Sequence, residues 1–425
     1  MKSLKTNKHT VAVIGAGAAG LMAAGTAAQQ GAQVLLFERN EKVGRKLAIT
    51  GKGRCNVTNN CDTQTFLSNI PQNPRFLYSA LGAFSVADTM AFFEQLGVPL
   101  KTERGSRVFP VSDRARDVVD ALYHWVRRCG VTIIQAAVTE ICTGTDGAVC
   151  GVVADGRMRR ADCVIAATGG KSYPLTGSTG DGYLWAQQLG HTVTPLRASL
   201  VPLECTGKTC PRLQGLSLKN VRLTIFENNK KLHEGFGEML FTHFGISGPL
   251  VLSASSHMRA WDRAAYRAEI DLKPALDEAT LDKRILSDFS QQLNADFHNS
   301  LGRLLPRKLI PIVVERSGID AHQKVHEITK KQRRSLVRVC KHFELDISAP
   351  RPVEEAIVTS GGVSVREIVP KTMASKKVPG LFFAGEIIDV DGYTGGFNLQ
   401  CAWSTGYLAG WNAAQSIEHT EGETK

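Results

Sequence analysis

The chain has 425 residues and carries 51 Lys and Arg against 40 Asp and Glu, a formal net charge of +11. A chain of this length indicates two or three domains with a sizeable buried core, which excludes a small scaffold held by disulfides. Its ten cysteines are scattered without a Cys-x-x-Cys pair. They therefore indicate free thiols in a reducing, cytoplasmic compartment and no metal site.

The N-terminal region imitates a signal peptide. Lys2, Lys5 and Lys8 precede an apolar stretch over residues 11–28. We interpret this stretch as a strand, a turn and a helix, because Gly-x-Gly-x-x-Gly spacing runs through it. No other segment reaches about 18 consecutive apolar residues, so we expect no membrane span.

Residues 9–40 predict a β-α-β unit that binds a dinucleotide. Gly15 allows a tight turn, Gly17 lets the backbone approach a pyrophosphate, and Gly20 lets the helix pack close to the strand. The free N–H groups at the start of the helix suit the phosphates, and an acid at the end of the second strand suits the ribose hydroxyls. The cofactor-binding residues predicted here are Gly15, Gly17, Ala18, Ala19, Gly20, Glu38 and Arg39.

The next part of the chain continues this alternation of helices and strands. The pattern predicts helices over 83–97, 113–130 and 183–189, with Asp113 as an N-cap and Gly130 as a stop. Strands are expected over 131–136, 151–154 and 161–167.

The pattern of apolar residues changes at about residue 195. Short apolar segments at 200–203, 221–227, 250–253 and 266–272 predict an antiparallel sheet or small barrel. From 275 to about 343 the period becomes helical, with Leu281, Ile285, Phe289, Leu293 and Phe297 at four-residue spacing. Residues 353–358 return to an extended pattern. A buried strand over 381–386 and a helix over 398–414 are then expected to rejoin the N-terminal domain.

Three separated elements favour FAD over NAD as the resident cofactor. A strand ends in Ala-Gly-Glu at residue 386, a Gly-rich loop then opens the last helix, and an earlier strand runs into Thr168-Gly169-Gly170. The N-terminus of the last helix is expected to face the flavin carbonyl edge, where negative charge develops on reduction. No second Gly-x-Gly-x-x-Gly occurs, so NAD(P)H is expected to act as a transient reductant. The further cofactor residues predicted are Arg45, Lys46, Thr168, Gly169, Gly385, Glu386, Gly395, Gly396, Phe397 and Asn398.

Two cysteines raise a disulfide-reductase alternative. Cys55 and Cys61 follow the first β-α-β unit, but five residues separate them where that class of enzyme has four. The missing second nucleotide motif also counts against it.

The fold class expected is α/β, a discontinuous Rossmann-like FAD-binding domain with an inserted antiparallel β domain and a helical subdomain. The FAD-binding domain would comprise 1–194 and 361–425. The inserted β domain would comprise 195–274 and a return strand at 346–360. The basic helical subdomain would comprise 275–345.

Positive charge is concentrated in the helical part. Between residues 301 and 345 there are eleven Lys and Arg against four Asp and Glu. Lys330, Arg334 and Arg338 fall on one face of a predicted helix. A solvated helix face is one explanation, and contact with RNA phosphates is the other.

Four motifs, spread over nearly the whole chain, resemble the YhiN/BaiN-type FAD-dependent oxidoreductases. They lie at residues 44–59 (GRKLAITGKGRCNVTN), 241–249, 359–363 and 395–400. The resemblance implies an FAD domain made from both chain ends, an inserted β domain and a helical subdomain within the insert. It implies either reduction of conjugated enones in steroid-like bile acids or formation of dihydrouridine in large-subunit (23S) ribosomal RNA. Many members are described as aminoacetone oxidase-like.

The two implied reductions share one chemistry. Hydride adds at the β carbon of an alkene conjugated to a carbonyl, charge develops on the carbonyl oxygen, and an acid protonates the α carbon. Cys55 is the candidate acid, with a buried packing role as the alternative. His243 is a second candidate acid or carbonyl donor, with a structural role as the alternative. Lys52 and Arg54 are candidates for RNA phosphates, or for gripping FAD.

The sequence favours large-subunit ribosomal RNA as substrate, because a bile-acid reductase needs an apolar groove and no basic patch. A reductase or oxidase of a small enone or amine is the alternative, and an RNA-binding flavoprotein without turnover is a third. No membrane or metal partner is expected. The oligomeric state stays open, and a monomer is compatible with the sequence.

Overall fold

The computed structural model describes residues 9–416, so Lys2, Lys5 and Lys8 of the signal-like segment lie outside the described residues. Within that range the chain forms two compact units, residues 9–199 with 353–416 (unit 1) and Leu200–Pro352 (unit 2). The sequence placed the return boundary at 360/361. Residues 353–360 belong instead to unit 1, because β18 (Val358–Ser360) pairs with β11 (Arg197–Ser199) and with no barrel strand.

Unit 1 is built on a five-stranded parallel sheet. Its order is β19 (Leu381–Phe383), β10 (Cys163–Ala166), β1 (Thr10–Ile14), β2 (Gln33–Glu38) and β6 (Thr132–Gln135). β1, β10 and β19 are buried along almost their whole length, as expected for strands inside a parallel sheet that is covered on both faces. This confirms the α/β, Rossmann-like fold class and the β-α-β unit of residues 9–40.

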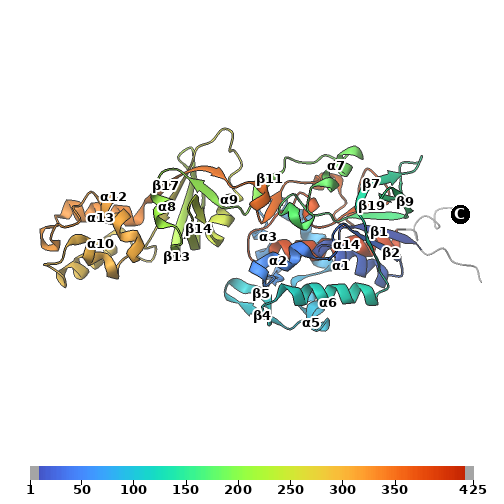
Figure 1. The fold of residues 1–425 in the computed structure, drawn as a ribbon, viewed down its shortest axis with the longest axis horizontal. Coiled ribbons are helices and arrows are strands. Elements are labelled where there is room, and N and C mark those ends of the chain that lie inside the picture. The colour runs from blue at the N-terminus through green and yellow to red at the C-terminus, as the bar shows by residue number, and fades with distance from the viewer. Residues whose placement is uncertain (1–8, 417–425) are drawn as a thin grey trace, which may run out of the picture. The chain divides into compact units, whose positions relative to one another are not determined.

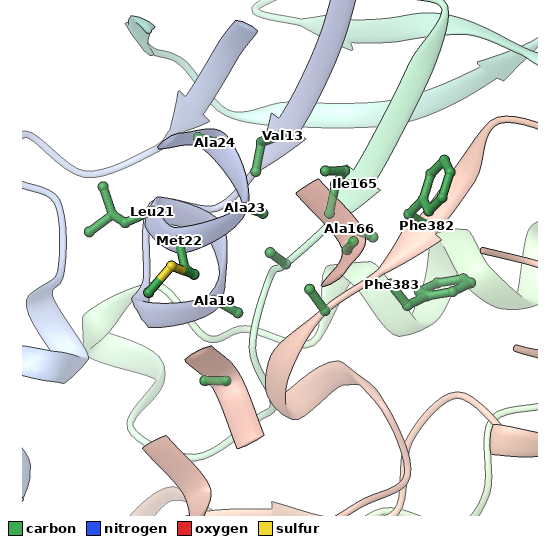
Figure 2. Packing of buried hydrophobic residues seen from close by; sticks show 14 of the residues in the cluster. Val13, Ala19, Leu21, Met22, Ala23, Ala24, Ile165, Ala166, Phe382 and Phe383 are labelled. Atoms are coloured by element: carbon green, nitrogen blue, oxygen red, sulfur yellow. The ribbon is translucent and has the colours of Figure 1, made fainter. Parts of the chain in front are cut away.

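The last helix packs on the first. Gly406 and Gly410 of α14 (Phe397–Gln415) lie against α1 (Ala18–Gln29), where an added Cβ would meet the carbonyl oxygens of Ala19 and Ala23 at 2.5 and 2.3 Å. The two backbones can approach this closely only because both positions are glycine. Figure 2 shows the small side chains of α1, such as Ala23, beside the strands that carry Ile165 and Phe382.

The other predicted helices of unit 1 are present. They are α5 (Val86–Gln95), α6 (Ala115–Arg128) and α7 (Asp181–Gln188). Asp113 does not cap α6, because its carboxylate is bound by Arg54 and Lys101; the N-cap residue is Arg114. The further helices are α2 (Arg45–Gly53), α3 (Thr63–Ser68) and α4 (Tyr78–Ala83).

Two small antiparallel sheets complete unit 1. One comprises β3 (Thr58–Asn59), β5 (Arg107–Pro110) and β4 (Leu100–Glu103). The other comprises β7 (Val138–Thr143), β8 (Val149–Ala154) and β9 (Arg157–Arg160).

Unit 2 contains a closed barrel of six strands. Its order is β12 (Leu203–Cys205), β15 (Gly245–Ser247), β14 (Lys230–Phe241), β13 (Ser217–Glu227), β16 (Tyr266–Asp271) and β17 (Phe343–Pro350). The strand predicted at 250–253 is wrong: these residues lie in α9 (Pro249–Ser255). Gly248 and Pro249 form a helix start there, since proline is favoured in a first turn. A short helix, α8 (Thr209–Leu213), precedes β13.

The helical part of unit 2 lies between β16 and β17 in sequence (Figure 1). It contains α10 (Glu278–Ser290), α11 (Phe297–Ser300), α12 (Ile310–Ser317) and α13 (Lys330–Lys341). Leu281, Ile285 and Phe289 are buried as their spacing predicts, whereas Leu293 lies beyond the end of α10 and is exposed. A capping box between Thr329 and Gln332 begins α13.

No single helix between residues 9 and 416 is long and apolar enough to cross a membrane. One bent pair, Pro74–Ala83 with Val86–Gln95, reaches that length and composition.

Candidate functional site

The turn after β1 has the shape that the glycine spacing predicts. Gly15 has φ +98°, and a Cβ there would lie 2.6 Å from the Ala167 carbonyl oxygen. A Cβ on Gly20 would lie 1.7 Å from the Gly15 carbonyl oxygen, so the helix packs directly on the turn. A Cβ on Gly17 would meet no atom within 4 Å. The protein closes around two of these glycines and leaves open space beside the third.

Two long helices present free N-termini in unit 1. Neither α1, which begins at Ala18 and Ala19, nor α14, which begins at Phe397 and Asn398, has a side-chain cap or an acid in its first turn. Such ends carry partial positive charge and unpaired N–H donors, which suit phosphates and carbonyl oxygens.

Glu38 stands at the end of β2, beside the same turn. Its Oε2 accepts a hydrogen bond from the Ala16 N–H at 2.9 Å, and its Oε1 accepts from the backbone and side chain of Asn40 at 2.9 and 2.6 Å. The carboxylate is thus fixed where a ribose is expected. Arg39 and Arg45 hold the surrounding loops, through Thr179 and Asn40 respectively.

Two buried side-chain oxygens in unit 1 have no hydrogen-bond partner within the described residues. They are Thr168 Oγ1, next to Gly169 after β10, and Asn56 Oδ1, after Cys55. Buried polar atoms are nearly always paired with protein, water or a ligand. The sequence prediction did not include Asn56; its position inside the Gly-rich loop of residues 44–59 was the only signal.

Glu386 binds three groups at the end of β19. Its Oε2 lies 2.6 Å from Lys46 Nζ, and its Oε1 accepts from the Thr359 N–H at 2.8 Å and from Ser172 at 3.1 Å. Gly385, with φ +76°, leaves room for Ala19, whose Cβ would lie 2.7 Å from an added Cβ. Glu386 therefore ties the loop before α14 to α2.

The loop before α14 is also closely packed. Gly395 and Gly396 have φ +126° and +103°, and a Cβ on Gly396 would lie 2.3 Å from the Thr58 carbonyl. Asn398 holds the start of this loop through both the N–H and the carbonyl of Gly392, at 2.8 and 2.7 Å. Phe397 is buried edge-to-face against Phe66.

These features fit FAD. Open space beside Gly17, uncapped helix starts at α1 and α14, a fixed acid at the end of β2 and two unpaired buried oxygens would suit its pyrophosphate, ribose and flavin.

Cys55 lies inside a strained turn. Gly51, Lys52, Gly53 and Cys55 all have φ between +57° and +83°. The thiol is fully buried, and this burial raises the pKa of Cys55 to about 12. Cys55 is therefore a neutral thiol at physiological pH. Its role as the acid stays a prediction.

Arg54 is engaged within the protein. Its Nη2 lies 2.5 Å from Glu103 Oε1 and 2.5 Å from Asp113 Oδ1, and its guanidinium stacks 4.1 Å from the centre of the Phe109 ring. Hydrogen bonding to Arg54 lowers the pKa of Glu103. Within residues 9–416, Lys52 is exposed and has no ion pair, whereas the partly exposed Arg54 is paired with two carboxylates. The two candidates for phosphate binding therefore differ in whether their charge is already neutralised.

His243 belongs to unit 2, in the turn between β14 and β15. It is exposed and packs edge-on against Phe244, whose ring lies 4.7 Å below the Arg351 guanidinium. Its role as acid or donor stays a prediction.

The cations of α13 divide into two groups. Arg333 is paired with Asp282 at 2.5 Å and Lys341 with Asp271 at 2.6 Å. The others are exposed and have no acidic partner in the described part of the chain. We call them the basic face of α13: Lys330, Lys331, Arg334 and Arg338.

Known proteins resemble this chain over almost its full length. The model of the HI0933-like protein Rossmann domain matches residues 9–412. A 3-dehydro-bile acid delta(4,6)-reductase of Clostridium scindens is 34% identical over 412 residues, covering 96% of this chain and 99% of that protein. A ribosomal RNA dihydrouridine synthase of Haemophilus influenzae is 34% identical over 401 residues, covering 93% of this chain and 96% of its own.

The fold also recurs in solved structures. The 3-ketosteroid delta1-dehydrogenase of Sterolibacterium denitrificans superimposes with a TM-score of 0.52 at 12% identity, covering 97% of this chain and 100% of that one.

Proposed function

This chain belongs to the HI0933-like family, and from that premise we propose that it is an FAD-dependent reductase of a carbon–carbon double bond conjugated to a carbonyl. Both relatives named above are similar over at least 93% of this chain. Reduction of a 3-dehydro-bile acid and formation of dihydrouridine are both additions of hydride and a proton to such a bond.

Each part of unit 1 has a task in this proposal. Bound FAD supplies hydride at its N5 atom. The start of α1 and the backbone at Gly17 would bind the pyrophosphate, and Glu38 would bind the adenosine ribose. The uncapped start of α14 would stabilise the negative charge that a bound flavin gains on reduction. NAD(P)H is the proposed reductant.

Cys55 is the proposed donor of the second hydrogen, as a proton to the α carbon. A buried thiol keeps its proton across the physiological pH range. Cys55 would therefore be in its neutral, protonated form before each turnover. Lys52, exposed three residues earlier, is the proposed contact for an anionic substrate group.

We propose uridine in large-subunit ribosomal RNA as the substrate, and the basic face of α13 is the observation that supports it most. Four cations without acidic partners lie on one helix. A steroid-like substrate would not need these cations, whereas the phosphates of RNA would bind them. A uridine in folded RNA must be unstacked before it can be reduced. Phosphate contacts would hold the RNA in place while that base is turned out of the stack.

A small-molecule enone is the second candidate. The bile-acid reductase is as similar to this chain as the ribosomal RNA enzyme and is matched over 99% of its own length. Overall similarity therefore does not separate the two substrates, and the choice rests on the charge of α13.

Nucleoside mass spectrometry of ribosomal RNA tests the choice. In a strain that lacks this gene, one dihydrouridine in large-subunit RNA should be absent. Wild-type protein should restore it, and the double variant Arg334→Glu, Arg338→Glu should restore it poorly. An unchanged nucleoside profile, together with reduction of a steroid enone by the purified flavoprotein, would establish the small-molecule function instead.

A further inference from the structure

Three side chains with metal-binding chemistry converge in the helical part of unit 2. Asp296, His298 and His322 each place one ligand atom within 4.8 Å of the other two. Residue spacing does not indicate this site, because its third member lies more than twenty residues after the first two and no cysteine takes part.

The backbone holds these residues together. The segment at 295–298 runs beside the segment at 321–325, with hydrogen bonds from Phe297 N–H to the Gln323 carbonyl at 2.9 Å and from His298 N–H to the Ala321 carbonyl at 3.1 Å. A bridge also pairs Asp296 with Lys324. The convergence is thus fixed by main-chain pairing and does not depend on side-chain rotamers alone.

The protonation of His298 suits a metal ligand. Its Nδ1 lies 2.8 Å from the Ala321 carbonyl oxygen, which can only accept, so Nδ1 carries the proton. Nε2 of the neutral ring therefore keeps its lone pair. Metal-binding histidines typically donate their second ring N–H to a carbonyl or carboxylate in this way.

The two carboxylate oxygens of Asp296 face different side chains, and only one of them binds a lysine. Its Oδ1 binds Lys324 Nζ at 2.8 Å, whereas its Oδ2 lies 3.5 Å from His322 Nδ1. The His298 and His322 rings are 5.3 Å apart at 77°. His322 is 79% exposed, so it can turn to close the last gap to a shared ion.

We propose that Asp296, His298 and His322 bind one divalent transition-metal ion, with Zn²⁺ as the best match. Two imidazoles and one carboxylate are ligands that zinc takes at about 2.0–2.2 Å in tetrahedral sites, with water as a fourth ligand. Magnesium and calcium prefer all-oxygen sites and fit this set poorly.

The bound ion would restrain the segment that contacts the start of α13. Gln323, between the ligand His322 and Lys324, exchanges side-chain hydrogen bonds with Gln332 of the α13 capping box, the shorter at 2.8 Å. Joining the two segments through metal thus restrains the loop on which the start of α13 rests. The site takes no part in the proposed reduction.

Isothermal titration of tag-free, full-length protein, first stripped with a chelator, tests the proposal. Wild-type protein should bind one equivalent of Zn²⁺, and His322→Ala should weaken that binding at least tenfold. His322 is exposed, so its loss should leave the fold intact. The matched control is His124→Ala, an exposed histidine on α6, which should bind Zn²⁺ as wild type does.

A second measurement reports the ligands directly. Co²⁺ in the same site should show visible absorption bands of a low-coordinate complex in wild type and in His124→Ala, and not in His322→Ala or Asp296→Asn. Absence of Zn²⁺ binding by wild type, or equal affinity in wild type and His322→Ala, would overturn the proposal.

Discussion

Lys46 and Glu386 are 340 residues apart in sequence and form an ion pair with 2.6 Å between Nζ and Oε2. Both side chains are about one-fifth exposed. The pair joins α2, which follows β2 in sequence, to the segment after β19 that precedes α14. It thereby joins the two parts of the chain from which the sequence predicts the cofactor site.

Breaking this pair should weaken the fold and the retention of FAD together. Lys46→Met leaves the Glu386 carboxylate short of its cation, which should cost about 2 kcal/mol of unfolding free energy. Arg116→Met, which removes an exposed pair with Asp120 on α6, is the control and should cost no more than about 0.5 kcal/mol. Urea unfolding and visible flavin absorbance measure the two effects. Equal losses in both variants would contradict the role given to Lys46.

The glycines of the first turn should separate folding from cofactor binding. A methyl group at Gly17 enters open space, so Gly17→Ala should fold with nearly wild-type stability but purify with little FAD. At Gly20 the same methyl group meets the Gly15 carbonyl oxygen, so Gly20→Ala should lose about 3 kcal/mol of stability. Full flavin content in a stable Gly17→Ala protein would show that the cofactor does not approach that position.

Of Cys55, Cys61 and Cys150, Cys55 should react most slowly with iodoacetamide in the native protein. Because burial raises its pKa from 9.0 to about 12, almost no thiolate forms at pH 8. Iodoacetamide at that pH, followed by peptide mass mapping, should modify the partly exposed Cys61 and Cys150 well before Cys55. Equally fast modification of Cys55 would contradict its burial.

The same shift predicts how stability depends on pH. The folded state holds the Cys55 proton more tightly than the unfolded state. Its contribution to stability is therefore complete below pH 9 and is lost as pH rises towards 12. Unfolding free energies of wild type and Cys55→Ala at pH 8 and pH 10 should show the steeper decline in wild type.

Charge reversal on α13 should weaken binding of ribosomal RNA without loss of flavin. For Arg334→Glu with Arg338→Glu, the slope of log affinity against log salt should fall by about 1.4 to 1.8 if each residue contacts one phosphate. Filter binding over a salt series measures it.

The matched control for that variant changes net charge equally. Arg127→Glu with Arg128→Glu reverses two exposed arginines of α6 and should leave the slope near that of wild type. The same loss in both double variants would mean that overall charge, and not the basic face of α13, attracts the RNA.

Much of unit 1 follows from short-range patterns. The roles of Gly15, Gly17 and Gly20 depend on turn geometry within a few residues, so spacing alone predicts them. β1, β10 and β19 of the parallel sheet are buried apolar runs, which also makes them recognisable. Local rules failed at residues 250–253, where an apolar run looks extended but Gly248 and Pro249 start α9.

β14 escaped prediction because barrel residues alternate between inside and outside. Its segment Lys230–Phe241 is largely polar at its start and carries two glycines, so no apolar run marks it. Its pairing with β13 on one side and β15 on the other defines it instead, and such pairing is a property of the whole barrel.

The candidate site depended on long-range contacts in the same way. Arg54 looked like a free cation for phosphates, but its partners Glu103 and Asp113 follow some fifty residues later. Nothing near Arg54 in the sequence indicates them. Asp113 was assigned to a helix cap for the same reason: its local context is a helix start, while its actual partners lie on other elements.

The central sheet has a consequence for synthesis on the ribosome. β10 pairs with β1 on one side, but its other edge is completed only by β19, which is translated after the entire second unit. Until then a growing chain exposes an unpaired, apolar strand edge, which can form strand pairs with other chains. Premature termination near residue 380 would therefore leave a polypeptide that is both unable to retain a nucleotide and prone to aggregate.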